Sequence, residues 1–185
     1  MKKIRFTIYG EPAPGGSKTI GYKTDHKGAV RMSYMNTKRF GRVLRPIAFL
    51  RDAGGKRNAK WKRDVERGVL AHMQTNFLTM IPAGVPVTLR MTFYIKRAAN
   101  HYGTGKNAAT LNKHGRSLPY PTKDPDTTKL IRSTEDAMKG IVWYDDNQVV
   151  DQHAYKRWTK TPQHSPGCVI EIESLGEPEL FGGDE

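Results

Sequence analysis

Residues 124–150 read DPDTTKLIRSTEDAMKGIVWYDDNQVV, and several structural signals follow one another in them. Leu130, Thr134 and Ala137 recur at spacings of three and four, which is typical of a helix with one buried face. A glycine ends this pattern, and a short apolar run then leads into Asp-Asp-Asn. The alternation of apolar and polar residues that begins at Gln148 predicts a strand. A helix that is followed so closely by a strand indicates a fold that mixes the two.

The rest of the chain supplies further strands and a second helix. Apolar residues alternate in 4–8 and 87–95, and residues 168–172 begin with an apolar run over 168–170, so each segment is expected to be a strand. The second helix is expected to begin at Asn58 as its N-cap. Its core-facing stripe is predicted to consist of Trp61, Val65, Val69, Leu70 and Met73.

The predicted fold is a mixed α/β domain over residues 1–175. It combines a small mixed sheet with two packed helices and basic loops at one edge. Residues 176–185 read GEPELFGGDE and are expected to form an acidic, flexible tail. A chain of 185 residues has the length expected of one domain.

The net charge of +13 is spread unevenly along the chain. Residues 1–123 hold 25 Lys and Arg against five acids, whereas residues 124–185 hold six against thirteen. Proteins with so large a positive charge usually bind phosphate backbones. Carboxylates weaken binding to phosphate backbones. The acids between Asp124 and Asp151 are therefore either solvent-exposed side chains without a role in binding or ligands of a bound cation.

Several classes of protein are excluded by the composition. No apolar run approaches the roughly 18 residues that a membrane helix needs, and the N-terminus lacks the apolar region of a signal peptide, so a cytoplasmic protein is expected. A single cysteine, Cys168, excludes an internal disulfide and is expected to be a small buried residue rather than a catalytic thiol. The glycines and lysine of residues 10–19 have the wrong spacing for a phosphate loop, so no nucleotide cofactor is expected.

Two basic stretches are candidate nucleic-acid contacts. Residues 19–57 interleave aromatic with cationic side chains, and are expected to be a long loop or a β-hairpin region. Lys38 and Arg39 are candidate DNA-binding residues within it, with a merely solvated basic loop as the alternative. A second basic, glycine-bearing loop is expected over residues 96–121.

Two pairs of aspartates flank the predicted helix at 126–139. We call Asp124 and Asp126 the N-terminal acidic node, and Asp145 and Asp146 the C-terminal acidic node. A helix of about 12 residues is roughly 18 Å long, so the nodes meet only if the following chain runs back along it. The four residues before Asp145, if extended, recover roughly 13 Å. Converging carboxylates suit Mg²⁺ or Mn²⁺, although aspartates are also common helix caps and turn residues.

Residues 124–156 resemble the signature of RusA-type Holliday junction resolvases. That family carries Asp-x-Asp-Asn-Leu-x-Lys, then Asp-Ala-Leu, an aromatic residue, Asp-Asp-x-Gln-Val and a downstream lysine. The matching residues are Asp136-Ala137-Met138, Trp143, Asp145-Asp146-Asn147-Gln148-Val149 and Lys156. The N-terminal strand, with the Gly-Glu-Pro-Ala-Pro and Lys18 that follow it, is similar to the family's opening.

The start of the motif departs from the family pattern. Without a gap, Asp126 falls on the family's first metal-binding aspartate and Thr128 on its second, so one carboxylate is missing. The same alignment places Lys129 on the family's asparagine and Arg132 on its lysine. A gapped alignment would pair Asp124 with Asp126 and would require two extra residues in the helix. We prefer the ungapped alignment.

The resemblance implies a Mg²⁺-dependent, structure-selective endodeoxyribonuclease that acts as a homodimer and resolves four-way junctions by paired nicks, in recombination and repair. Mn²⁺ would substitute for Mg²⁺. Asp126, Asp145 and Asp146 would hold the ion with help from Asp124, and Arg132 would act at the scissile phosphate together with Lys18. Other expected DNA contacts are Lys129, Lys156 and Arg157. The alternative is a non-catalytic branched-DNA or RNA-binding protein on the same fold.

Two further expectations concern side chains near this motif. If residues 146–156 form one extended strand, Lys156 lies roughly 33 Å from Asp146 in its own subunit. A contact to phosphate or across a dimer is then expected, rather than a place beside the metal. Arg132 and Asp136 lie four residues apart on the predicted helix, a spacing that allows an ion pair.

Overall fold

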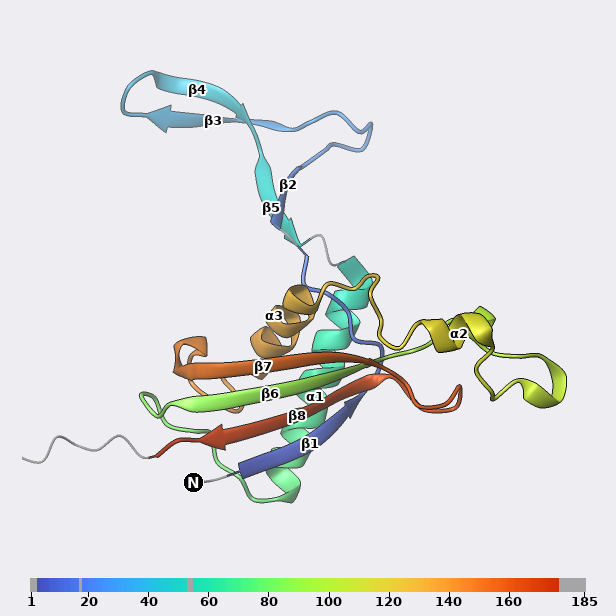
Figure 1. The fold of residues 1–185 in the computed structure, drawn as a ribbon. Coiled ribbons are helices and arrows are strands. Elements are labelled where there is room, and N and C mark those ends of the chain that lie inside the picture. The colour runs from blue at the N-terminus through green and yellow to red at the C-terminus, as the bar shows by residue number, and fades with distance from the viewer. Residues whose placement is uncertain (1–2, 17, 53–54, 177–185) are drawn as a thin grey trace, which may run out of the picture.

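The computed structural model describes residues 3–16, 18–52 and 55–176. Its body is a sheet with strand order β1-β8-β6-β7, in which β6 and β7 are parallel and the other neighbours antiparallel. The strands are β1 (Lys3–Tyr9), β6 (Val87–Ile95), β7 (Val149–Trp158) and β8 (Gly167–Ser174). Two helices, α1 (Gly55–Thr75) and α3 (Thr127–Met138), cover one face of the sheet (Figure 1). The fold is therefore mixed α+β, as the sequence predicts.

The core lies between the sheet and the two helices. Alternation in β1 buries Ile4, Phe6 and Ile8 toward the helices and exposes the residues between them. The indole of Trp61 in α1 is fully buried, and its Nε1 donates a hydrogen bond to Oγ1 of Thr134 in α3 at 3.0 Å. This bond satisfies the polar atom of the indole and fixes α3 against α1.

The start and the stripe of α1 correct two expectations. The helix begins at Gly55, so Asn58 is not its N-cap but a buried residue inside it, to which the Ser133 hydroxyl of α3 donates a hydrogen bond. Leu70 is 45% exposed, whereas the other four predicted stripe residues are buried. At about 100° per residue, those four spread over about 120° of the helix surface, and Leu70 lies about 60° beyond the edge of that arc.

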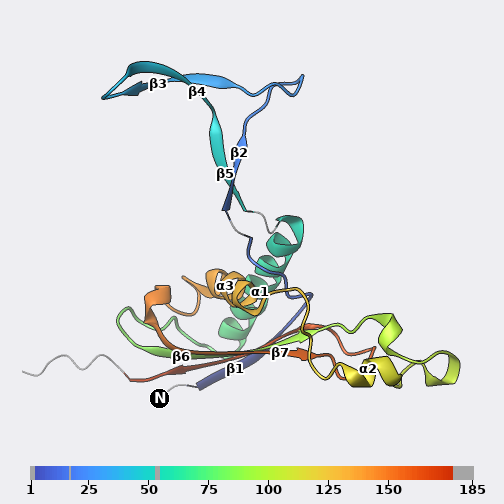
Figure 2. The ribbon, with the colours of Figure 1, turned by 45° about the horizontal axis from the view of Figure 1, so that its top comes forward.

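An arm made of residues 18–52 leaves the body near α1 and α3 (Figures 1 and 2). Its stem pairs β2 (Lys18–Tyr22) with β5 (Ala48–Asp52). Its crossbar, which we define as residues 23–46, contains the paired strands β3 (Met32–Thr37) and β4 (Gly41–Pro46) and a turn closed by a bridge between Thr24 and Val30. The hairpin interpretation of this basic stretch is therefore confirmed.

The second basic segment is a folded loop rather than an open one. It contains three short helices, η1 (Ala99–His101), η2 (Gly105–Asn107) and α2 (Lys113–Ser117). Arg97 donates hydrogen bonds to the carbonyls of Gly115 and Leu118 at 2.9 and 3.1 Å. The indole of Trp158 donates to Leu118 as well, at 2.9 Å. Arg97, just after β6, and Trp158, at the end of β7, thus hold this loop in place.

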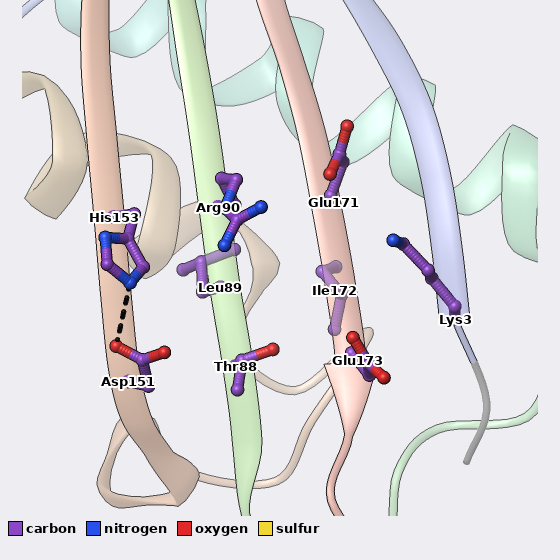
Figure 3. A pocket seen from close by; sticks show the side chains of 9 residues that line it. All are labelled: Lys3, Thr88, Leu89, Arg90, Asp151, His153, Glu171, Ile172 and Glu173. Carbon is purple, nitrogen blue, oxygen red and sulfur yellow. Dashed lines mark ion pairs between the residues drawn. The ribbon is translucent and has the colours of Figure 1, made fainter.

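The sheet face opposite the helices carries charges of both signs. Figure 3 shows a shallow pocket on it, where Arg90 of β6 lies between His153 of β7 and Glu171 of β8. His153 lies 3.2 Å from Asp151, and Glu171 lies 2.9 Å from the guanidinium of Arg5. Because the charges alternate, this part of the face lacks the uniform positive potential of a phosphate-binding surface.

Two expectations about composition can be compared with the described residues. Cys168 is fully buried, and burial raises the pKa of its thiol, which confirms it as a small core residue. Among the described residues, no helix has the length and apolar character that crossing a membrane requires. The tail at 176–185 lies, apart from Gly176, outside the described residues.

Candidate functional site

The N-terminal acidic node lies at the start of α3. Asp126 is the N-cap of this helix, and its Oδ1 accepts a hydrogen bond from the backbone N of Thr128 at 3.1 Å. Asp124 precedes it by two residues, across a cis peptide bond to Pro125. Both aspartates are exposed. The capping role of Asp126 thus accounts for one of its oxygens and leaves the carboxylate open to solvent.

Lys156 lies beside this node. Its Nζ donates hydrogen bonds to the backbone carbonyls of Lys123 and Pro125, at 2.9 and 2.8 Å. β7 therefore holds the loop that positions Asp124 and Asp126. The expectation of one extended strand over 146–156 is wrong, because residues 146–148 form a short helix and β7 begins at Val149. The sequence also did not predict the place of Lys156 next to the N-terminal acidic node, because that place depends on how β7 packs under α3.

The segment between α3 and the second node is a turn. Gly140 has a positive φ of 75°, and its N donates to the carbonyl of Trp143 at 2.8 Å. Val142 and Trp143 are fully buried, and the N of Ile81 donates to the carbonyl of Val142. The expectation of an extended run back along α3 is wrong, because burial of these apolar side chains draws the segment into the core.

The C-terminal acidic node is held by a dense set of contacts. Asp145 caps the short helix η3 (Asp146–Gln148) and forms a capping box with Gln148. The Nζ of Lys139 lies 3.2 Å from Oδ2 of Asp145 and 3.6 Å from Oδ2 of Asp146. The indole Nε1 of Trp143 donates to Oδ1 of Asp146 at 3.3 Å. Both carboxylates therefore have fixed orientations at the C-terminal end of α3.

Gln148 anchors this node to the body. Its Oε1 accepts from the backbone N of Tyr144 and of Asp145, at 2.9 and 3.0 Å. Its Nε2 donates to the carbonyls of Pro82 and Val85, at 2.6 and 3.0 Å. All hydrogen-bonding positions of this buried amide are occupied by these four partners, so Gln148 fixes the position of the node.

The charges of the node shift the pKa values of its members. The hydrogen bond from the backbone N of Asn147 lowers the pKa of Asp145, and the ammonium of Lys139 lowers it further. In return, the hydrogen bond to Asp145 raises the pKa of Lys139. Both groups thus stay ionised across the neutral range.

Glu135 is a candidate that the sequence-based search missed. Partial burial raises the pKa of its carboxyl above the ordinary value of 4.5, an effect that the charges of Asp146 and Asp136 reinforce and a hydrogen bond with Gln152 of β7 opposes. Glu135 therefore lies near enough to Asp146 for the two charges to interact. Its position one turn before Lys139 on α3 was the available signal, but the pairing with Gln152 is tertiary.

Other predicted residues of α3 have separate surroundings. Arg132 and Lys129 are exposed, and the carbonyl of Lys129 accepts a hydrogen bond from the N of Gly15 at 2.9 Å. Asp136 pairs with Lys62 of α1 at 2.9 Å. The spacing of Arg132 and Asp136 allowed a pair within the helix, but the tertiary partner takes the carboxylate.

The remaining predicted DNA contacts are spread over the molecule. Lys38 and Arg39 lie at the tip of the crossbar, and the backbone of Lys18 lies at the base of the stem, where its side chain is outside what the structure describes. Arg157 lies on the sheet face opposite the helices, with its guanidinium 5.0 Å from the ring centre of Tyr120 and 5.4 Å from that of Tyr155. The structure therefore does not gather these cations into one patch.

The two acidic nodes stay apart in one chain. α3 has 12 residues, so about 18 Å of helix separates its first turn from its last. Within residues 3–16, 18–52 and 55–176, no group of three or more His, Cys, Asp and Glu side chains is close enough to hold a metal ion. Carboxylate oxygens are nevertheless the donors that Mg²⁺ prefers, and Mg²⁺ needs only one or two of them beside waters and a substrate phosphate.

Comparison with known protein families decides the assignment. Residues 27–173 match the family described as Endodeoxyribonuclease RusA. The chain belongs to this family. The match spans most of the chain and includes both ends of α3, the strands β6 to β8 and most of the arm. A search among curated proteins finds no match.

Membership of the RusA family indicates the kind of reaction in which the two acidic nodes could take part. Family membership indicates endodeoxyribonuclease activity, and the resemblance that the sequence carries in residues 124–156 lies wholly inside the matched range. α3 runs without interruption from Thr127, directly after Asp126, and both alignments of the motif allow such a helix. The ungapped alignment, in which Thr128 would stand where the family pattern has an aspartate, therefore stays a prediction.

Proposed function

We propose that this RusA family member is a Mg²⁺-dependent, structure-selective endodeoxyribonuclease that nicks branched DNA, with the four-way junction as its substrate. The observation that carries the proposal is the match of residues 27–173 to the family, together with oriented carboxylates at both ends of α3. Mn²⁺ is expected to replace Mg²⁺, because both take oxygen ligands. A role in recombination and repair follows from that substrate.

The residues of the two nodes have distinct roles in this proposal. Asp146 and Asp145 would hold the ion, with Glu135 close by, and Asp126 with Asp124 would supply the second set of oxygen ligands. A divalent cation held there would lower the pKa of a water and would offset the charge that develops on the phosphodiester. Lys139 lowers the pKa of Asp145 and, through its contacts with both carboxylates, helps to orient the C-terminal node.

Positively charged side chains would hold the DNA. Arg132 is exposed on α3, between the two nodes in sequence, and would contact the scissile phosphate. Lys129, on the first turn of α3, and Lys18, at the base of the arm, would contact the flanking phosphates. Arg157 lies on the other face of the sheet and would contact a more distant arm of the junction.

The separation of the nodes supports a homodimer. One ion cannot touch both ends of α3 in a single chain, because about 18 Å lies between them. In a two-fold dimer, the N-terminal node of one protomer meets the C-terminal node of its partner twice, which gives two equivalent sites. Two sites also match a substrate from which two strands must be cut.

The test is cleavage of a synthetic four-way junction beside a linear duplex of the same sequence. We expect nicks in the junction that require Mg²⁺ or Mn²⁺ and disappear in EDTA, with little cleavage of the duplex. Tight junction binding without any cleavage in either metal would favour the non-catalytic binding protein instead. Equal cleavage of junction and duplex would remove the structure selectivity from the proposal.

A further inference from the structure

The arm exposes apolar side chains that the body does not cover. Among the described residues, half of the large hydrophobic side chains that are exposed lie in this one segment. They are Ile20, Tyr22, Val30, Met32, Tyr34, Met35, Phe40, Leu44 and Phe49. Two-stranded ribbons are marginally stable by themselves in water, and exposed apolar surface of this extent usually marks a binding site.

The charge of the crossbar indicates the kind of partner. Residues 23–46 hold seven Lys and Arg and a single acid, Asp25. The carboxylate of Asp25 accepts hydrogen bonds from the backbone N of Lys27 and of Ala29, both at 2.9 Å, so it serves its own turn. A surface with this net charge attracts a polyanion and repels a second crossbar. Nucleic acid is therefore the occupant that the crossbar fits.

The tip of the crossbar has a defined shape. β3 and β4 are joined by Lys38, Arg39 and Phe40, and Gly41 follows with a positive φ of 65°. Oγ1 of Thr37 accepts from the N of Phe40 at 3.0 Å and donates to the carbonyl of Gly41 at 3.2 Å. A short loop followed by a glycine with positive φ is a common hairpin connection, and it fixes the direction of its side chains.

Phe40 is the most exposed aromatic residue of the arm. Its side chain is 69% exposed, and the guanidinium of Arg39 lies 5.3 Å from the centre of its ring. Farther along the ribbon, the guanidinium of Arg42 lies 4.3 Å from the ring centre of Tyr34. The tip therefore joins a flat apolar ring to cations that can neutralise adjacent phosphates.

These features together select one form of DNA. A two-stranded ribbon fits the major groove, and aromatic rings bind nucleic acid by stacking on bases. An intact duplex offers no open base face to such a ring, whereas base pairs at a branch point do, because stacking is interrupted there. Apolar side chains that enter base steps use the same physical principle.

We propose that Phe40, at the tip of the crossbar, inserts against the unstacked base pairs at the branch point, with Lys38 and Arg39 on the flanking phosphates. This inference rests on the proposed function in that it takes branched DNA as the substrate. It adds that the arm, and not only the acidic nodes, distinguishes a branch from a duplex.

The test uses the full-length protein in EDTA and a four-way junction with a fluorescent adenine analogue at the branch point. Unstacking of the analogue raises its fluorescence, so wild-type binding is expected to increase the signal and F40A to abolish the increase. Because stacking of one base on an aromatic ring contributes about 1–3 kcal/mol, F40A should weaken junction binding at least about five-fold and leave duplex binding unchanged. F40W should retain both effects.

The matched control is F77A. Phe77 is 94% exposed on the body, in the loop after α1, and its loss should change neither the fluorescence nor the affinity. Thermal melting of both variants checks that they fold. Equal losses of junction and duplex affinity in F40A would overturn the inference, and so would a wild-type complex without increased fluorescence. A change in self-association of F40A, seen by sedimentation without DNA, would assign the tip to a second copy of the chain instead.

Failure of the proposed function would look different. Because fluorescence is read in EDTA, it does not depend on cleavage. A wild-type protein that never nicks DNA but gives the Phe40-dependent signal would refute the nuclease and keep the inference. If the wild type and F40A nick junctions equally well and neither raises the fluorescence at the branch point, the nuclease function would stand and the inference about Phe40 would be refuted.

Discussion

Asp146 has contacts within the fold and, in the proposed function, would also bind the metal ion. It accepts a hydrogen bond from the indole of Trp143 and lies 3.6 Å from the ammonium of Lys139. Both contacts orient the carboxylate, and the charge that they partly balance is the same charge that would bind a cation. A substitution that removes the negative charge of Asp146 but keeps the shape of its side chain therefore separates its role in the fold from its proposed role in metal binding.

Asp146→Asn is expected to abolish Mg²⁺-dependent nicking. Metal-free junction binding should stay equal or become tighter, because one charge that repels phosphates is lost and the basic arm is unchanged. The amide oxygen can still accept a hydrogen bond from Trp143, so the loss in the free energy of unfolding should be below about 1 kcal/mol. In a protein of this size, such a loss lowers Tm by less than about 2–4 °C. Cleavage, binding in EDTA and thermal melting on one preparation decide the point.

Asp151→Asn provides the control for that substitution. Asp151 is exposed on β7, five residues away, and faces the sheet surface opposite the helices. The change in charge is the same, so a general electrostatic effect would alter both variants alike. Wild-type cleavage by an Asp146→Asn protein that melts and binds normally would refute the assignment of the C-terminal node.

Glu135 allows a prediction about pH. Its folded-state pKa lies above the ordinary value of 4.5, so its ionisation destabilises the fold, and the cost grows as pH rises from that value through the folded-state pKa. Glu135→Gln should therefore melt at a higher temperature than the wild type at pH 7, with the difference disappearing at pH values below about 4. If Glu135 also helps to bind the metal, addition of Mg²⁺ will raise Tm less in this variant. A lower Tm at pH 7 would show that the bond to Gln152 outweighs burial.

At the scale of single elements, α3 is the piece on which the site is built. Its N-cap places Asp126, its last turn leads to Lys139, and its buried face packs on α1 through Thr134 and Trp61. β7 runs beneath it and holds the loop before the helix through Lys156. The helix therefore determines the distance between the two nodes, and β7 determines the position of the loop that carries the N-terminal acidic node.

Lys156→Met tests the support that β7 gives to this loop. The substitution keeps the aliphatic stem but removes two charge-assisted hydrogen bonds to carbonyls, which should lower the free energy of unfolding by about 1–3 kcal/mol. Nicking should fall as well, because Asp124 and Asp126 lose their fixed position. Lys160→Met, at an exposed lysine just beyond β7, is the control. An unchanged Tm with a salt dependence of binding shallower by about 0.9 would instead make Lys156 a phosphate contact.

At the scale of the whole molecule, two features bear on how the protein would bind a large branched substrate: the projecting arm and the separation of the two ends of α3. The arm projects far from the body, and the acidic nodes cannot share an ion within one protomer (Figures 1 and 2). The proposed homodimer would double the number of arms and would bring opposite nodes together.

Mixing two inactive variants tests that arrangement. Asp126→Asn and Asp146→Asn should each be inactive, but a heterodimer of the two has one site in which both nodes are intact. After equal mixing and exchange of subunits, about a quarter of the wild-type sites should be active, and they should give single rather than paired nicks. No recovery, with subunit exchange shown independently by differently tagged chains, would place both nodes of a site in the same chain.

Periodicity along the sequence determined much of this protein, because it reports which face of each element is buried. It predicted the four strands of the main sheet, the span of α3 and the aspartates at both of its ends. Only the tertiary structure decided which other parts of the chain lie next to the two ends of α3. Burial of Val142 and Trp143 made a turn where an extended run was expected, packing of β7 under α3 brought Lys156 to the N-terminal node, and Gln152 came to face Glu135. Each of these contacts joins distant parts of the chain or depends on the depth of the core, and local periodicity carries no information about either.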